Sequence, residues 1–142
     1  MAIKNYTTSV PAYRSIDEIQ KSLLNHGAIG MTMLYEKGTG RISALQFLLE
    51  IKDNKVPFAL PVNWRLFQEV LKQQEIKKWV DEDFCYKVAW RNIRDWVLAQ
   101  MALYETQMVE LPQVFLPFAT DQKGETLYNK ISDSGFLLGE GN

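Results

Sequence analysis

The sequence is poor in the residues that most catalytic and metal sites need. Its 142 residues include one cysteine, Cys85, and one histidine, His26. A single cysteine cannot form a disulfide within the chain, and no Cys/His pair occurs at zinc-ligand spacing. Nucleophilic catalysis needs a base beside a serine or cysteine, and a lone histidine at a helix end is usually a capping or surface residue. We therefore expect no enzyme activity, no metal and no cofactor, and we expect Cys85 to be a buried apolar residue.

The sequence also lacks an excess of charge and any long hydrophobic run. Lys and Arg number 16 against 17 Asp and Glu, a formal net charge of −1. This balance argues against binding nucleic acid through a strong overall positive field. No apolar run approaches the roughly 18 residues of a membrane span, and the first ten residues contain no signal-peptide core. We expect a cytoplasmic protein with no membrane partner and no strong nucleic-acid partner.

Residues 83–108 contain no glycine and no proline, and we expect them to form one long central helix. Apolar residues recur there at steps of three and four, which places them on one helix face. They are Tyr86, Trp90, Ile93, Val97, Met101, Tyr104 and Met108. Ala89, Trp96 and Leu103 widen this face. So wide an aromatic face predicts a homo-oligomer, a dimer through this helix.

Further elements are predicted from local patterns. β-Branched and aromatic residues predict strands over 3–10, 29–35, 42–51 and 56–60. Short turns between the last three favour antiparallel neighbours. A capping-box pattern, Ser15 to Glu18, predicts a helix over 16–26, and Asn63 predicts the cap of a helix over 64–73.

The expected fold class is therefore α+β. It is a four-stranded, mainly antiparallel sheet with its helices packed on one face, and the long helix in the C-terminal half is the main layer. One domain covers residues 1–142, with a loosely ordered tail over 120–142.

A narrow basic edge runs beside the apolar face of the long helix. At about 100° per residue, Lys87, Arg91 and Arg94 fall within about 60° of one another, and Asn92 is their neighbour. A basic row beside an aromatic ring can hold a phosphate while the ring stacks on a base. The candidate ligand-binding residues are Lys87, Trp90, Arg91, Asn92 and Arg94. The alternative is a solvated face of intrahelical ion pairs.

Several short stretches give the chain a resemblance to known sequences. They are Lys4-Asn-Tyr-Thr-Thr8, Glu18-Ile-Gln20, His26-Gly-Ala28, Phe58-Ala-Leu-Pro61, Val88-Ala-Trp-Arg91, Asp95-Trp96 and Val114-Phe-Leu-Pro117. Over most of residues 4–118 the chain resembles a family of small uncharacterised proteins from phages and bacterial mobile elements. The family has no known activity, so the resemblance implies no catalytic residues. Small non-enzymatic phage proteins often act against host defence, either by capturing a nucleotide signal or by blocking a defence protein.

Three non-enzymatic functions stay open. The first is counter-defence by capture of a nucleotide-like anionic signal, with Arg91 and Arg94 on phosphate and Trp90 stacking. The second is a protein-interaction module that inhibits a host defence complex through the apolar C-terminal segment 113–118. The third is weak binding of single-stranded nucleic acid, which the net charge of −1 disfavours.

Overall fold

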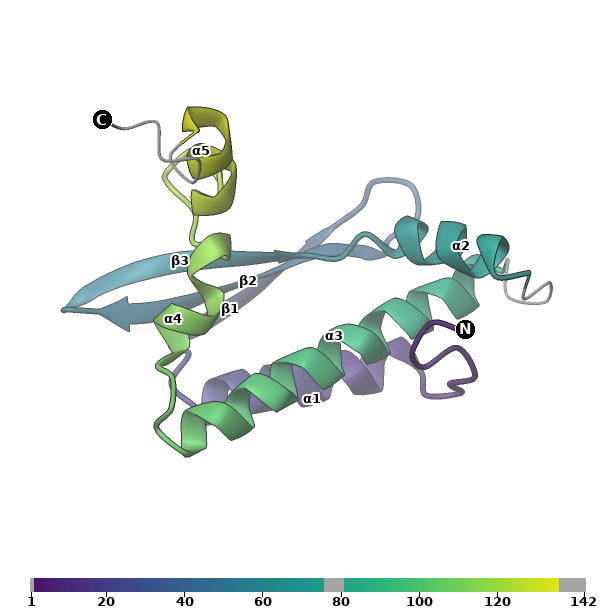
Figure 1. Cartoon of the computed structure of the whole chain (residues 1–142), viewed down its shortest axis with the longest axis horizontal. Helices are drawn as coiled ribbons and strands as arrows, with labels where there is room; N and C mark the ends of the chain where they lie inside the picture. The colour runs from purple at the N-terminus through teal and green to yellow at the C-terminus, as the bar shows by residue number, and fades with distance from the viewer. Residues whose placement is uncertain (1, 76–80, 136–142) are drawn as a thin grey trace. The chain divides into compact units, whose positions relative to one another are not determined.

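The computed structural model describes residues 2–75 and 81–135, and the chain divides into two compact units. Unit 1 comprises the residues up to His26 together with Val62–Leu103, and unit 2 comprises Gly27–Pro61 and the residues from Tyr104 onward. Figure 1 shows the elements in chain order. They are α1 (Ala12–Asn25), β1 (Gly30–Tyr35), β2 (Ile42–Ile51), β3 (Asn54–Pro61), α2 (Trp64–Gln73), α3 (Glu82–Glu105), α4 (Leu111–Phe115), η2 (Leu116–Phe118) and α5 (Leu127–Ser134).

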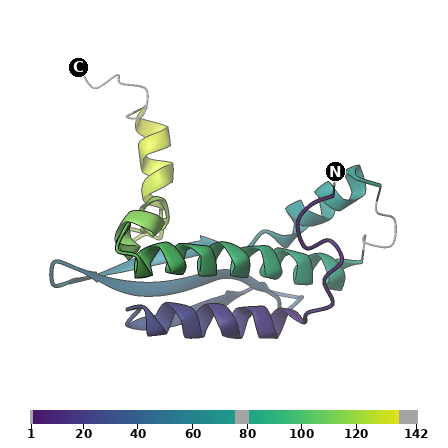
Figure 2. The ribbon, with the colours of Figure 1, turned by 60° about the horizontal axis from the view of Figure 1, so that its bottom comes forward.

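Unit 1 is built from α1, α2 and α3, and its interior is filled by large apolar side chains. α1 and α3 lie side by side and run in the same direction (Figure 2). The ring of Tyr86 meets Trp64 edge-on at 6.5 Å between ring centroids and Trp90 at 6.3 Å. Such edge-to-face pairs add stability beyond the area that they bury. One buried cluster joins α2 to α3, and its members are Trp64, Leu71, Cys85, Val88 and Ala89. The prediction that Cys85 is buried is confirmed.

The buried face of α3 is turned relative to the predicted one. The helix ends at Glu105, before the predicted end at residue 108, and Trp96 and Leu103 are exposed. Cys85 and Val88 are buried because α2 packs on the side of α3 that carries them. Periodicity located the helix, but which residues flank its apolar stripe depends on where the neighbouring helix packs.

The sheet has three strands, so the prediction of a four-stranded sheet is wrong. Residues 3–10 form a loop of turns in unit 1. The Ile3 amide donates to Gln74 Oε1 at 2.8 Å, which ties this loop to α2. The Lys4 carbonyl accepts from Asn92 Nδ2 at 2.8 Å, which ties it to α3. β-Branched composition predicted a strand here, but side chains of two helices satisfy backbone groups that a sheet would otherwise pair.

α1 begins earlier than predicted, at Ala12, and does not use the predicted capping box. Ser15 lies inside the helix and is buried, and the Glu18 carboxylate binds Arg94 of α3. Pro11 is the N-cap residue and has extended φ and ψ. Its missing backbone N–H costs no hydrogen bond there, because the N–H groups at the start of a helix have no partner within the helix. A contact between two helices thus replaced the local capping interaction.

Unit 2 contains an antiparallel sheet in the order β1-β2-β3. The β2–β3 hairpin pairs Ile51 with Asn54, and the two residues between them, Lys52 and Asp53, have φ values of 49° and 68°. Two consecutive positive φ values are typical of a type I′ turn, whose twist matches that of the flanking strands. The predicted strands over 42–51 and 56–60 are therefore confirmed as neighbours in one hairpin.

The two faces of this sheet differ in the size of their side chains. On the first face Phe47 of β2 stacks on Phe58 of β3 at 5.5 Å between centroids. Phe115 of α4 meets Phe47 edge-on at 5.1 Å, so α4 covers this face within unit 2. Side chains alternate between the faces along each strand, and the second face carries small side chains at Ala44, Ala59 and Pro61. The second face is the floor of the candidate site.

The segment after η2 pairs with β3 and leads into α5. The Thr120 amide donates to the Pro57 carbonyl at 2.9 Å. Thr126 Oγ1 accepts from the Asn129 amide and caps α5, and Gly135 ends the helix with a φ of 72°. Part of the predicted loosely ordered tail therefore contains a capped helix, and residues 136–142 lie outside the described residues.

Candidate functional site

The predicted basic edge of α3 lies in unit 1, where ion pairs tie it to α1. Arg94 binds the Glu18 carboxylate through Nε and the Asp95 carboxylate through Nη1, the latter at 3.0 Å. Arg91 Nη1 lies 3.6 Å from Glu18 Oε1 and 3.4 Å from Ser15 Oγ. A phosphate clamp needs accessible guanidinium groups. In this structure carboxylates of the protein already occupy those of Arg91 and Arg94.

The pKa values of these carboxylates follow from the same contacts. Partial burial alone would raise the pKa of the Asp95 carboxyl. Hydrogen bonds from Asn5, Arg94 and Lys4 outweigh burial and lower that pKa to about 2. Partial burial likewise opposes, but does not cancel, the effect of the neighbouring guanidinium groups, which lower the pKa of Glu18. Both carboxylates therefore stay ionised at neutral pH and hold the basic side chains.

Two of the other three predicted site residues are used in the packing of unit 1. Trp90 is 0% exposed and its ring meets Tyr86, so it offers no accessible face on which a base could stack. The Asn92 side chain donates to the Lys4 carbonyl and so fixes the N-terminal loop. Lys87 is half-buried on the same helix. The structure gathers the five residues along α3, but it does not arrange them as an open site.

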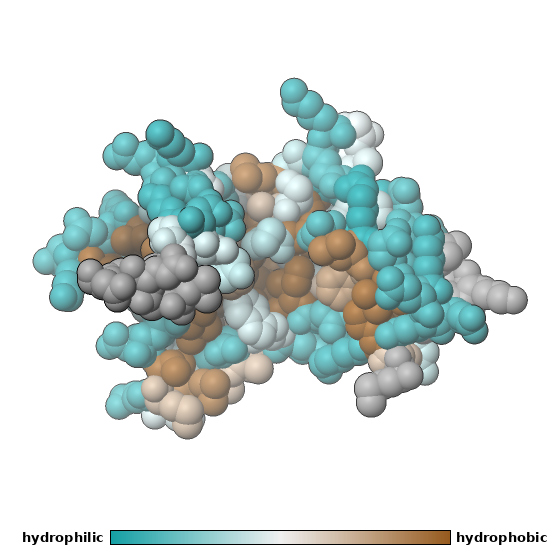
Figure 3. All heavy atoms as spheres, turned by 45° about the horizontal axis from the view of Figure 1, so that its top comes forward, coloured by the Kyte–Doolittle hydropathy of each residue, from teal (hydrophilic) through white to brown (hydrophobic). Residues whose placement is uncertain are grey.

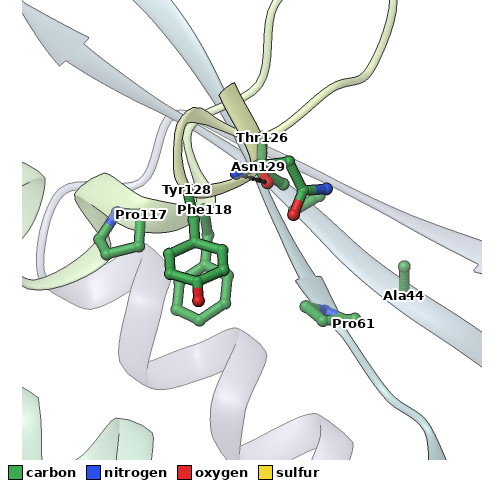
Figure 4. A pocket seen from close by; sticks show the side chains of 8 residues that line it. Ala44, Pro61, Pro117, Phe118, Thr126, Tyr128 and Asn129 are labelled. Carbon is green, nitrogen blue, oxygen red and sulfur yellow. Dashed lines mark hydrogen bonds between the residues drawn. The ribbon is translucent and has the colours of Figure 1, made fainter. Parts of the chain in front are cut away.

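A groove on the second face of the sheet is the candidate site in unit 2. Its volume is about 480 Å³, within the roughly 300–1,000 Å³ of ligand sites. Figure 4 shows its side chains. The lining residues are Ala44, Ala59, Pro61, Pro117, Phe118, Thr126, Tyr128 and Asn129. We call this site the apolar groove.

Small side chains of β2 and β3 form the floor of the apolar groove. Ala44 of β2 is the register partner of Pro61 of β3, and Ala59 lies two residues before Pro61 on the same face. A methyl group or a pyrrolidine ring rises little above a sheet, so space remains over the strands. A larger side chain at any of these positions would fill that space.

η2 and α5 supply the walls of the groove. Pro117 and Phe118 come from η2, while Tyr128 and Asn129 come from the first turn of α5. Figure 4 shows the rings of Phe118 and Tyr128 extending in the same direction, and it marks the hydrogen bond between Thr126 and Asn129 that fixes the start of α5. The Tyr128 side chain is 55% exposed, so one wall is open to solvent.

The lining determines which chemistry the groove can accept. Aromatic and aliphatic surface is combined with the neutral polar side chains of Thr126 and Asn129, and none of the described residues that line it is charged. Figure 3 shows hydrophobic residues reaching the molecular surface between hydrophilic ones. Such a site stabilises an uncharged apolar group by removing it from water. It offers no cation to hold a phosphate, so it does not fit the predicted nucleotide-like ligand.

No family model, curated protein or solved structure matches this chain. In the part of the chain that the structure describes, no three His, Cys, Asp or Glu side chains are grouped to hold a metal ion. None of the helices described there has the length and hydropathy of a membrane span.

Sequence reasoning did not identify the apolar groove. The sequence points to the apolar segment 113–118 as a protein-interaction segment, but it does not place that segment beside the sheet. The alanines of the floor carry no chemical signature of their own. Only the pairing of the chain after η2 with β3 brings these segments together.

Proposed function

We propose that this protein is a non-enzymatic binding protein that captures another protein through the apolar groove. The observation that supports the proposal most strongly is the uncharged lining, with Phe118 and Tyr128 above a floor of small residues. A groove of this kind accepts an aromatic or branched apolar side chain as an anchor. Burying such a side chain contributes about 1.5–3 kcal/mol.

The exposure of the groove favours a protein ligand over a small molecule. Sites for small molecules enclose most of the ligand surface, whereas Tyr128 and the neighbouring Leu116 are exposed. Exposed apolar side chains beside a groove extend the contact surface and mark protein-interaction sites. The ligand is therefore a folded or extended protein segment with an apolar anchor.

The resemblance to phage and mobile-element proteins supports a host defence protein as the partner. Inhibition then follows from occupation of a surface that the defence complex needs for assembly. This is the second of the three functions predicted from the sequence. Capture of a nucleotide by α3 is less well supported, because Glu18 and Asp95 hold the arginines that it requires.

Selection of random displayed peptides on the purified chain tests the proposal. Enriched peptides should share an aromatic or branched apolar anchor and should shift the backbone amide signals of Ala44, Ala59 and Tyr128 in nuclear magnetic resonance spectra. Ala59→Leu fills the groove floor and should weaken binding at least about tenfold, equivalent to about 1.4 kcal/mol. The matched control is Ala99→Leu on an exposed position of α3, which should leave affinity unchanged.

Two results would count against this function. Equal peptide affinity in wild type and Ala59→Leu would exclude the groove as the binding site. Calorimetry with a panel of linear and cyclic nucleotides should give no heat. Heat that disappears in Arg91→Ala would instead support nucleotide capture by the basic edge of α3.

A further inference from the structure

The two outer edges of the sheet in unit 2 differ in their protection. β3 carries Lys55 and Pro57, and a bridge joins its Phe58 to Ala119. The Thr120 amide also donates to the Pro57 carbonyl. Proline, lysine and a covering segment are devices that stop an edge strand from pairing with another chain. The outer edge of β3 is therefore closed.

β1 carries none of these devices. Its sequence, Gly-Met-Thr-Met-Leu-Tyr, contains no proline and no charged residue. Among the described residues no strand lies beside its outer edge. The one register shift in its pairing results from an extra residue, Ser43, in β2, so the bulged strand is β2 and not β1. Ile29, Leu34 and Tyr35 are exposed, Tyr35 to 63%. An uncharged edge with exposed apolar side chains is a template for pairing with another strand.

We propose that β1 pairs antiparallel with β1 of a second copy, about a two-fold axis at Thr32, to form one continuous six-stranded sheet. The occupant is a second copy because the strand is complementary to itself. Directly opposed residues of an antiparallel pair lie on the same face, and a one-residue slip would put core-facing side chains opposite solvent-facing ones. The two-fold axis must therefore pass through a residue, and Thr32 is the centre of the stretch 29–35.

This register covers the exposed apolar side chains. Ile29 of one protomer faces Tyr35 of its partner, an aromatic–β-branched pair, and Thr32 faces its symmetry mate. Leu34 faces Gly30, which has no side chain, so the exposed leucine can lie over the partner's backbone. Each pair is of a type that stabilises sheets by about 0.2–1 kcal/mol or removes apolar surface from water.

The same register continues the buried face of the sheet. Met31 and Met33 pair with Phe47 and Leu45 of β2 within one protomer, so both lie on the core face. Across the two-fold axis Met31 faces Met33 and extends that face from one protomer into the other. The predicted homo-oligomer would thus form through β1, whereas the sequence pointed to the long helix.

Analytical ultracentrifugation and a symmetric crosslink test this interface. The wild-type mass should rise with concentration from 16.4 kDa towards twice that value. Thr32→Cys should form a disulfide-linked dimer under mild oxidation. Opposed residues of antiparallel strands have Cα atoms about 4.5–5.5 Å apart, within the range of disulfides. Cys85 is buried and does not compete. The control Thr7→Cys, at an exposed position of the N-terminal loop in unit 1, should form no disulfide-linked dimer under the same conditions.

A charge variant separates this interface from misfolding. Thr32 is exposed in the single chain, so Thr32→Lys should keep the melting temperature of dilute, monomeric wild type, while two opposed lysines abolish the dimer. The monomeric variant should still bind groove peptides, which keeps this test independent of the proposed function. A single 16.4 kDa species at all wild-type concentrations would overturn the proposal. The proposal would also be overturned if Thr32→Lys remained a dimer and the additional change Trp96→Glu made it monomeric, because that result would place the interface on α3.

Discussion

In unit 1 the aromatic side chains of the core are enclosed, and ion pairs link α1 to α3 at the surface. In unit 2 aromatic residues both fill the core and stand beside an open groove. Trp64 and Trp90 are buried among helices, whereas Tyr128 stands exposed over a floor of alanine and proline. The difference shows that aromatic content alone does not identify a binding surface. Small residues opposite an aromatic side chain leave the space that a ligand can use.

The two candidate sites also differ in charge. Glu18 and Asp95 bind the arginines of α3. Asp95 also binds Lys4 and Asn5 of the N-terminal loop. The groove of unit 2 has no charged lining among the described residues. Ion pairs thus link α1, α3 and the N-terminal loop within unit 1, whereas the described lining of the groove in unit 2 is uncharged.

The largest expected effect concerns the enclosed aromatic core of unit 1. Trp90→Ala should lower the free energy of unfolding by about 3–5 kcal/mol, because it leaves a cavity that the helices cannot fully collapse. Trp96→Ala, on an exposed position of the same helix, should cost under about 1 kcal/mol. Chemical denaturation followed by circular dichroism measures both. Equal losses of unfolding free energy in the two variants would show that Trp90 is not enclosed in the core of unit 1.

The next effect concerns the ion pairs between α1 and α3. Glu18→Gln removes the charge that holds Arg91 and Arg94 and should cost about 1.5–3 kcal/mol. The adjacent Asp17→Asn breaks only the exposed pair with Lys21, which is 2.9 Å long, and should cost under about 0.5 kcal/mol. Urea titrations of both variants provide the comparison. If the two variants lose the same unfolding free energy, the ion pairs of Glu18 with α3 contribute no more to stability than the exposed pair of Asp17.

The pH dependence of stability should reflect Asp95. Its pKa in the folded protein, about 2, is below the ordinary value of 3.8, so the folded state binds fewer protons than the unfolded state. The stabilisation is therefore complete above about pH 4 and is largely lost as the pH falls towards about 2, a change of roughly 2 kcal/mol. Denaturation at several pH values should show this loss in wild type and a smaller one in Asp95→Asn. If the stability of Asp95→Asn depended on pH in the same way as that of wild type, Asp95 would not be the source of the loss at low pH.

The smallest effect concerns Cys85. Replacement by alanine should cost about 1 kcal/mol, because only a sulfur atom is lost from the buried cluster with Trp64. Burial raises the pKa of the Cys85 thiol, so the native protein should react slowly with thiol reagents at neutral pH. A thiol introduced at Thr7 in the Cys85→Ala background should react rapidly. Fast modification of native Cys85 would show that unit 1 opens easily.

Local patterns were sufficient for most elements of the fold. The β-branched and aromatic composition of 42–51 located β2, and the glycine- and proline-free period of three to four over 83–108 located α3. The α2 boundaries, Trp64–Gln73, were likewise predicted correctly. The resemblance to phage proteins and the counter-defence role stay predictions.

The tertiary structure decided the remaining features, because each depends on residues far apart in the sequence. Residues 3–10 have the composition of a strand, yet Gln74 and Asn92 hold their backbone in a loop. The sequence leaves open whether the basic edge of α3 is a ligand site or a solvated face, and only the packing of α1 against α3 places Glu18 beside its arginines. The apolar groove exists only where β2, β3, η2 and α5 meet. Sequence periodicity defines the face that each element presents, and only packing defines which of those faces remains accessible.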